Sequence, residues 1–166
     1  MLIYEMINGE YSNGAFACVF FDNSGFATKI FFKKKDISRE DIEKVFQYEV
    51  DAHEIAAKNE NIKKYVPEFF GTIQCNQKKI IDSCNKDISD RFHLDLAYKM
   101  KKIDAVSEEK GLNDKRLIEL FTQAGIEYVK DCSVLIDKDT NTFVIDFATK
   151  EHEIIHKDLW ADSHSR

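Results

Sequence analysis

Two mostly apolar stretches near the N-terminus predict a β-hairpin. Residues 16–21 and 26–32 are rich in aromatic and β-branched side chains, and residues 22–25, Asp-Asn-Ser-Gly, are typical of a turn between strands. We therefore expect two antiparallel strands joined by a tight turn, within an N-terminal region of about 35 residues that consists of strands.

Two longer segments have helical spacing. Ser38 followed by Asp41 resembles a capping box and predicts a helix that runs to about Asn59. A second helix is expected over residues 114–124, before Gly125, which is a suitable stop. The apolar positions of the first helix form one stripe, made of Ile42, Val45, Phe46, Ala52 and Ala56.

Short runs of β-forming residues account for the rest of the pattern. Residues 66–73 predict a strand entered through Pro67, and residues 134–136 and 143–145 predict two more strands joined by a turn. Residues 92–100 alternate, which indicates a half-buried strand. Its apolar face would consist of Phe92, Leu94, Leu96, Tyr98 and Met100. The expected order is β-β-β-α-β-β-α-β-β with a short helix at the end. That is an α+β fold, with an antiparallel sheet first and a smaller helical part second.

Composition and charge restrict the class of function. A chain of 166 residues with 43% hydrophobic and 33% charged residues suits one soluble domain or one two-lobed unit. Its net charge of -6 argues against a general nucleic-acid binder, and no apolar run is long enough to predict a membrane helix. The first residues show no secretory signal peptide. The cysteines form no C-x-x-C pair, so we expect free thiols and no zinc site, although Cys75 and Cys84 could close a loop.

A turn of small residues precedes the first long strand. Ser12, Asn13, Gly14 and Ala15 lead into Phe16 and then, through two more small side chains, to Val19. Small side chains let backbone N–H groups approach a phosphate closely. The segment is a candidate nucleotide-binding loop, and a simple hairpin turn would explain it equally well.

Two charged residues occupy positions at which the pattern predicts apolar side chains. Lys29 falls within the run of residues 26–32, so it needs either a surface face or a partner. Glu49 falls on the apolar stripe of the first helix, where a carboxylate is costly unless it is paired. We expect an ion pair between Lys29 and Glu49. The alternatives are an edge-strand lysine that faces water and a glutamate exposed at the stripe's edge.

Four segments resemble, in chain order, the signature elements of protein kinases. The loop from Ser12 to Val19 resembles G-x-G-x-x-G-x-V, and residues 26–29 resemble the V-A-I-K strand, whose lysine holds phosphates and pairs with a helix glutamate. Residues 125–136 resemble the catalytic loop with the strand that follows it, and residues 143–148 resemble the strand and D-F-G element.

The resemblance implies roles for three further residues. Asp146 would bind the magnesium that bridges nucleotide phosphates, and Asp131 would be the base that accepts the substrate hydroxyl proton. Ser133 falls at the position of the second metal-binding residue, which is asparagine in kinases. The resemblance also implies ATP and Mg²⁺ as cofactors, with Lys29 and Glu49 positioning the nucleotide.

The chain departs from the kinase pattern at several positions. Ser12 and Ala17 replace loop glycines, Val129-Lys130 stands for histidine-arginine, and Ala148 stands for the last glycine of D-F-G. About twenty residues follow Asp146, so the activation segment and most of the large helical lobe must be missing.

The reduced length is similar to that of small effector kinases that bacteria deliver into host cells. One such type III effector group phosphorylates the host chaperone HSP90. This resemblance implies a single minimal kinase-like domain over residues 1–166, with an N-lobe to about residue 100 and a reduced C-lobe after it. It implies ATP-dependent phosphoryl transfer to a protein hydroxyl, with a protein substrate such as a host chaperone and no nucleic-acid or membrane partner. The protein would act in the host cell after export without a cleaved signal, or in the cytoplasm. The alternatives are a pseudokinase or binding module, and an unrelated α+β domain with chance motif matches.

Overall fold

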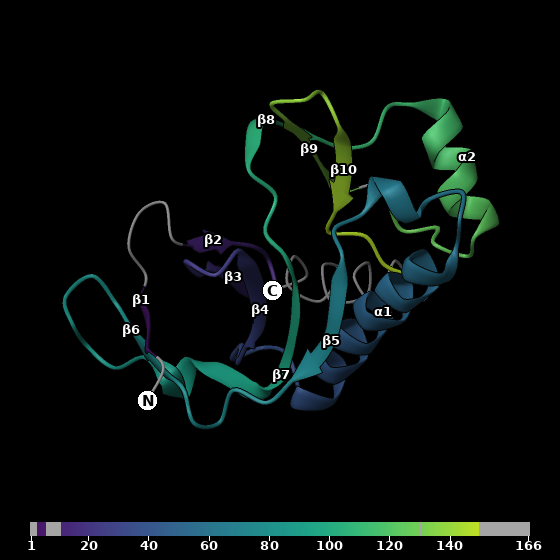
Figure 1. The fold of residues 1–166 in the computed structure, drawn as a ribbon. Coiled ribbons are helices and arrows are strands. Elements are labelled where there is room, and N and C mark those ends of the chain that lie inside the picture. Colours follow the sequence, from purple (N-terminus) through teal and green to yellow (C-terminus); the bar gives the residue numbers. More distant parts are fainter. Residues whose placement is uncertain (1–2, 6–10, 130, 150–166) are drawn as a thin grey trace. The chain divides into compact units, whose positions relative to one another are not determined.

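The chain forms two compact units that share one long helix. The computed structural model describes residues 3–5, 11–129 and 131–149 (Figure 1). Unit 1 comprises Met1–Phe46 and Phe70–Lys102, and unit 2 comprises Gln47–Phe69 and Ile103–Arg166. Helix α1, Arg39–Lys58, begins in unit 1 and ends in unit 2. The expected short helix at the chain's end lies outside the described residues.

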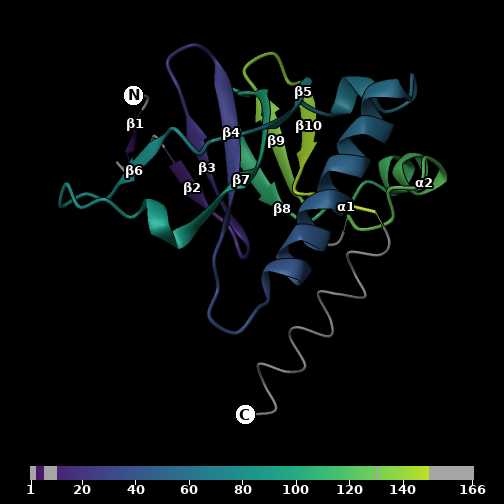
Figure 2. The ribbon, with the colours of Figure 1, turned by 90° about the horizontal axis from the view of Figure 1, so that it is seen from below.

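Unit 1 is built on a five-stranded sheet. Its strand order is β2-β3-β4-β7-β5, and the pairs β2–β3, β3–β4 and β4–β7 are antiparallel (Figure 2). The strands are β2 Tyr11–Asn13, β3 Ala17–Phe21, β4 Phe26–Phe32, β5 Phe69–Ile73 and β7 Phe92–Lys101. The expected hairpin is confirmed as β3 and β4, and the Asp22 carboxylate accepts backbone N–H bonds from Ser24 and Phe26 in the turn between them.

A small parallel pair covers part of one face of this sheet. Strand β1, Ile3–Glu5, pairs with β6, Lys79–Ile81, and a short 3₁₀ helix, η2, follows at Ser89–Arg91. Ile80 and Ile88 from this region join a core with residues of the sheet. The sheet contributes Cys18, Phe20, Ile30, Phe92 and Ala97 to that core.

Helix α1 forms as its capping and apolar pattern predict. The Ser38 hydroxyl accepts a bond from the backbone N–H of Asp41 at 3.1 Å, which satisfies one of the free donors of the first turn. Within unit 1, the Phe46 ring lies 5.5 Å from Phe31 and 6.4 Å from Tyr98, centroid to centroid. The start of the helix is therefore packed on the sheet face that carries Phe31 and Tyr98.

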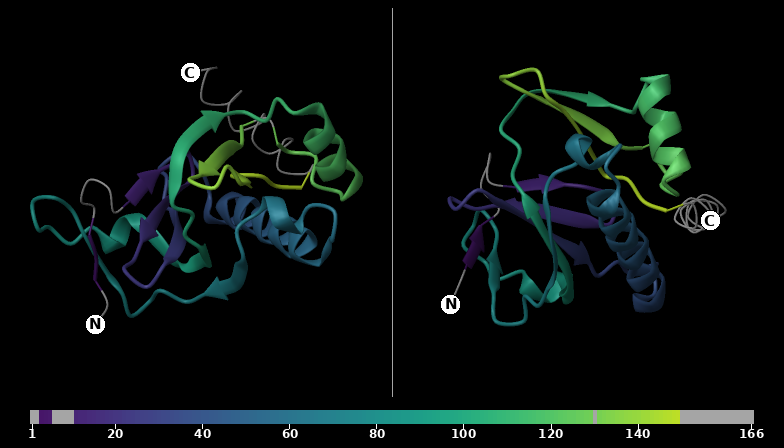
Figure 3. Two further views of the ribbon diagram at one scale, coloured as in Figure 1. Left: turned by 45° about the horizontal axis from the view of Figure 1, so that its top comes forward. Right: turned by 45° about the vertical axis from the view of Figure 1, so that its right-hand side comes forward.

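Unit 2 combines a three-stranded sheet with a second helix. The strand order is β10-β9-β8, with β8 at Ala105–Lys110, β9 at Ser133–Asp137 and β10 at Thr142–Ile145 (Figure 3). Helix α2, Lys115–Gln123, is capped by the Asp114 carboxylate, and a 3₁₀ turn, η1, lies at Lys63–Tyr65. The core of this unit includes Ala52, Ala56, Leu117, Phe121, Val134, Val144 and Phe147.

The α+β class and most predicted elements are confirmed, and one expectation needs correction. The strand at residues 92–100 exists, but its predicted single apolar face is wrong. Its register against β4 shifts between Ile30 and Phe31, which pair with Ala97 and His93 respectively. The extra residues at this bulge exchange the faces, so Phe92 joins Ala97 in the core that includes Ile80, and His93 is buried although the alternation placed it on the polar side. Strand β8 is an element that the pattern did not predict.

Candidate functional site

The small-residue turn occupies the end of the hairpin between β2 and β3. Ser12 and Asn13 close β2, Val19 lies within β3, and the residues from Ser12 to Ala15 are exposed. The Gly14 N–H bonds to the Ala17 carbonyl at 2.8 Å, which closes the turn. The turn is thus a tight, exposed backbone loop with half-buried Phe16 at its end.

Lys29 is a buried cation on a central strand. Strand β4 has neighbours on both sides, and Lys29 is paired in register with Val19 and Tyr98. Its side chain is 8% exposed, and its ammonium lies 5.6 Å from the Phe31 ring centroid and 5.9 Å from that of Tyr98. The face of an aromatic ring carries partial negative charge, which attracts a cation. The alternative of an edge-strand lysine in water is therefore wrong.

Glu49 is buried on α1, as its place on the apolar stripe predicts. It is 5% exposed, so the alternative of an exposed glutamate is also wrong. Lys29 belongs to unit 1 and Glu49 to unit 2, and the ion pair between them stays a prediction.

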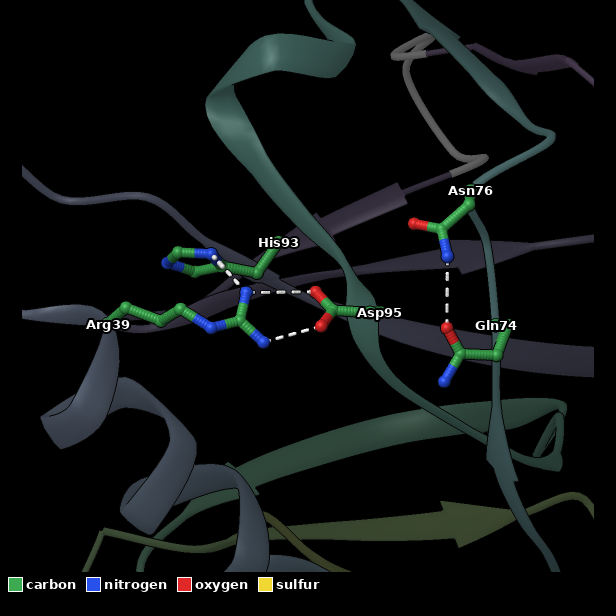
Figure 4. Close-up of polar contacts among 5 residues, drawn as sticks. All are labelled: Arg39, Gln74, Asn76, His93 and Asp95. Atoms are coloured by element: carbon green, nitrogen blue, oxygen red, sulfur yellow. Dashed lines mark hydrogen bonds and ion pairs between the residues drawn. The ribbon is translucent and has the colours of Figure 1, made fainter.

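A polar cluster fixes the first turn of α1 onto β7 in unit 1 (Figure 4). The Arg39 guanidinium donates to both carboxylate oxygens of Asp95, with Nη1 to Oδ1 at 3.0 Å, and Nη1 lies 3.4 Å from Nδ1 of His93. The bond from Arg39 lowers the pKa of Asp95, and burial, with Arg39 and Lys33 nearby, lowers the pKa of His93. A neutral His93 ring can then accept the third contact.

A hydrogen bond between two side chains lies near this cluster, on the segment that follows β5. The Asn76 amide nitrogen donates to the Gln74 amide oxygen at 3.0 Å (Figure 4). Both residues are exposed, so the bond contributes little to the position of the helix.

In unit 2, a backbone bridge joins the two segments that carry the predicted aspartates. Tyr128 N–H bonds to the Ala148 carbonyl at 3.2 Å, and Ala148 N–H bonds back to the Tyr128 carbonyl at 3.0 Å. The Tyr128 hydroxyl also donates to Oδ2 of Asp131 at 2.5 Å. The exposed Asp131 is therefore held in place beside the segment that contains Asp146.

Asp146 has an unusual backbone at the end of β10. Its φ of 60° lies in the left-handed region, which an aspartate adopts at a cost of order 1–3 kcal/mol. The side chain is exposed, whereas the next residue, Phe147, is 1% exposed and anchored. The Phe147 ring lies 4.6 Å from His53 and 5.7 Å from Phe121, centroid to centroid.

Burial and nearby charges perturb the buried thiol of Cys132. Its pKa is raised to about 11, first by burial and then by the carboxylates of Asp146 and Asp131. The Lys110 ammonium lowers the pKa of the same thiol, so a cation already lies near it.

Ser133 already has a cationic partner. It is buried, and its hydroxyl accepts a bond from the Lys110 ammonium at 2.8 Å. Lys110 also pairs with Glu108 at 2.9 Å. A metal ion at Ser133 would have to displace this ammonium.

The sequence interpretation missed three positioning residues: His53 and Tyr128 in unit 2, and Arg39 in unit 1. His53 lies one helical turn after Glu49 on the buried side of α1, so its spacing was a usable signal. The roles of Tyr128 and Arg39 depend on partners remote in the fold, and no local pattern indicates them.

Unit 2 also contains an open pocket of about 460 Å³ that involves none of the predicted site residues. Its lining residues are Tyr48, Asp51, Glu54, Ile55, Lys58 and Thr149.

No three His, Cys, Asp or Glu side chains gather as a metal-binding group in the part of the chain that the structure describes. No helix in residues 3–5, 11–129 and 131–149 is long and apolar enough to cross a membrane. Comparison of the sequence with protein-family models gives no match, and comparison with curated proteins gives none either.

Proposed function

We propose that this protein is a minimal ATP- and Mg²⁺-dependent protein kinase, of the kind that bacteria use as effectors or toxins against a host protein. The observation that carries the proposal is the bridge between Tyr128 and Ala148. It places the segment of Asp131 beside that of Asp146, fifteen residues further along the chain. Phosphoryl transfer needs few residues, because its catalysis is positioning and charge neutralisation.

Asp146 has the surroundings that a magnesium ligand needs. Its carboxylate is exposed, while buried Phe147 holds the backbone in a costly conformation directly beside it. Mg²⁺ usually takes one or two protein carboxylates and completes its octahedron with water and substrate phosphates. A single well-placed aspartate therefore fits, and bound Mg²⁺ would neutralise charge on the nucleotide phosphates.

Asp131 is suited to orient an acceptor hydroxyl. The Tyr128 hydroxyl donates to Oδ2, which leaves Oδ1 to accept a proton from a substrate. Because Asp131 is exposed, a large protein substrate could reach it.

The nucleotide side of the proposal uses Lys29 and the turn at Ser12–Phe16. Burial between two rings keeps the Lys29 ammonium in a low-dielectric place, where it attracts phosphate more strongly than in water. We propose that Glu49 pairs with it, because each charge is costly to bury alone. The exposed backbone of the turn would cover the phosphates.

The test is transfer of radiolabelled phosphate from γ-labelled ATP, to the chain itself or to a host-cell lysate. Asp146→Ala should abolish labelling, whereas Asp139→Ala, an exposed aspartate in the β9–β10 turn, should leave it unchanged. Lys29→Met should also abolish labelling, with the exposed Lys101→Met as its control. If wild type and Asp146→Ala label equally, the role of Asp146 is wrong.

One observation favours a pseudokinase or binding module instead. Lys110 holds the hydroxyl of Ser133, the position at which kinases have a metal-binding asparagine. A thermal-shift titration with ATP and Mg²⁺ distinguishes the two. Nucleotide at about 100 times its dissociation constant should stabilise a binder by about 2.7 kcal/mol. A shift without phosphate transfer would identify a pseudokinase, and no shift at millimolar nucleotide would favour a binding module that uses no nucleotide.

A further inference from the structure

Three side chains from three neighbouring strands form a row on unit 1, in which Phe70 is exposed and Phe26 and Lys99 are half-buried. In the strand order β4-β7-β5, Phe26 lies on β4, Lys99 on β7 and Phe70 on β5. The Lys99 ammonium lies 3.8 Å from the centroid of the Phe26 ring, and the Phe26 and Phe70 rings meet edge to face at 5.1 Å. These contacts make one surface of two rings and a cation, which we call the aromatic–lysine row.

The row continues a sheet face that is covered elsewhere. Phe26 and Ile30 are four residues apart on β4, so they point to the same face, and Ile30 belongs to the core that includes Ile80 of β6. Phe70, in contrast, is 45% exposed. Among the described residues, Phe70 and Val106 are the two exposed large hydrophobic side chains. Exposed aromatic surface beside a covered core is typical of an interaction site.

Two lysines of β7 bring positive charge to the row on an acidic chain, and the exposed Glu68 lies two residues before Phe70. Lys101 is exposed, lies two residues after Lys99 on the same strand and pairs in register with Phe26. The chain as a whole has a net charge of -6. The carboxylate of Asp22, in the turn before Phe26, is bound by the turn's own backbone N–H groups. A partner's carboxylates would therefore meet the ammonium groups of Lys99 and Lys101.

We infer that the aromatic–lysine row is a docking surface for an acidic segment of another protein that carries an aromatic side chain. Its carboxylates would pair with Lys99 and Lys101, and its ring would pack on Phe70 and the edge of Phe26. Charge complementarity selects this partner over a basic peptide, which the two lysines would repel. The inference does not depend on kinase activity, because none of these residues belongs to the proposed catalytic machinery.

The test is fluorescence anisotropy with a defined probe, the labelled peptide Asp-Trp-Asp-Asp-Trp-Asp, on the full chain. We expect saturable binding that weakens as salt is raised and at least a tenfold higher Kd for Lys99→Glu and for Phe70→Ser. Lys86→Glu and Val106→Ser make the same chemical changes at exposed positions elsewhere and should leave the Kd unchanged. Replacing aspartate by lysine in the peptide should abolish binding.

Three results would overturn the inference. One is no saturable binding of the aspartate peptide to the wild type. Another is that the two control variants weaken binding as much as Lys99→Glu and Phe70→Ser do. The third is that the wild type binds vesicles that contain phosphatidylserine but does not bind the peptide, and that Lys99→Glu loses the vesicle binding. The row would then be a membrane contact. Circular dichroism of each variant shows whether it has kept its fold.

Discussion

Replacement of Phe147 by alanine tests the link between the core of unit 2 and the conformation of Asp146. The Phe147 ring is 1% exposed and packs against His53 and Phe121 in the core of this unit. Removing it takes away the anchor that directly follows the left-handed residue Asp146. We therefore expect losses of both stability and phosphate transfer.

The expected loss of stability follows from complete burial of the ring. Truncation of a buried phenylalanine to alanine costs about 3–5 kcal/mol, the sum of lost transfer free energy and the cavity left behind. That is a large part of a typical total of about 5–15 kcal/mol, and it lowers Tm by about 2–4 °C per kcal/mol in a domain of this size. Phe70→Ala is the matched control, because its ring is 45% exposed and its loss should cost about 1 kcal/mol or less.

The assay is urea unfolding followed by circular dichroism, with the free energy of unfolding compared between the two variants. Phe147→Leu separates stability from activity, since a smaller apolar side chain preserves most of the burial. It should remain folded and still transfer phosphate more slowly than wild type, because a smaller contact with His53 anchors Asp146 less firmly. Equal unfolding free energies for Phe147→Ala and Phe70→Ala would refute the packing argument. Wild-type transfer rates in Phe147→Leu would refute the link to Asp146.

Three further predictions concern charges and thiols. If Lys29 and Glu49 pair, Lys29→Met and Glu49→Gln should be non-additive in unfolding free energy by about 0.5–3 kcal/mol, and additivity within about 0.5 kcal/mol would exclude the pair. Glu49→Gln should also reduce phosphate transfer less than Lys29→Met does, because an amide still accepts a bond from the ammonium. Arg39 lowers the pKa of Asp95, so their contact stabilises the fold above the ordinary aspartate pKa of about 3.9, and this stabilisation is lost as the pH falls through the lowered pKa. Because both side chains are more than a third exposed, Arg39→Ala should cost at most about 1 kcal/mol near neutral pH and progressively less in urea titrations below about pH 4; a cost independent of pH would contradict this. Finally, only Cys84 should react quickly with a thiol reagent in the native protein, because the other three cysteines are buried and burial raises their pKa values. All four should react after unfolding, and fast native reaction of a second thiol would contradict the burial.

Elements with strong local signals were predictable from the sequence. The hairpin of β3 and β4 follows from a four-residue turn between apolar runs, and the start of α1 follows from the Ser38 cap. The burial of Glu49 was predictable too, because a helix that buries one stripe must bury every residue on it. These features depend on residues close together in the chain.

Other features depend on partners that are far away in the chain. Strand β8, Ala105–Lys110, is exposed along its whole length and carries three charged residues, so no apolar alternation indicates it. It exists because β9 offers it a hydrogen-bonding edge. The exchange of faces along β7 likewise follows from the bulge against β4, which the sequence of β7 alone does not specify.

The candidate site shows the same division. The sequence by itself determined which residue types were available: a lysine in a β run, a glutamate on an apolar stripe and aspartates after short strands. Only the tertiary structure decided that Tyr128 bridges to Ala148, that Phe147 is anchored by His53, and that Lys110 binds Ser133. The physical reason is that propensity and periodicity act over a few neighbouring residues, whereas a site is assembled by packing and pairing between segments that only the folded chain brings together.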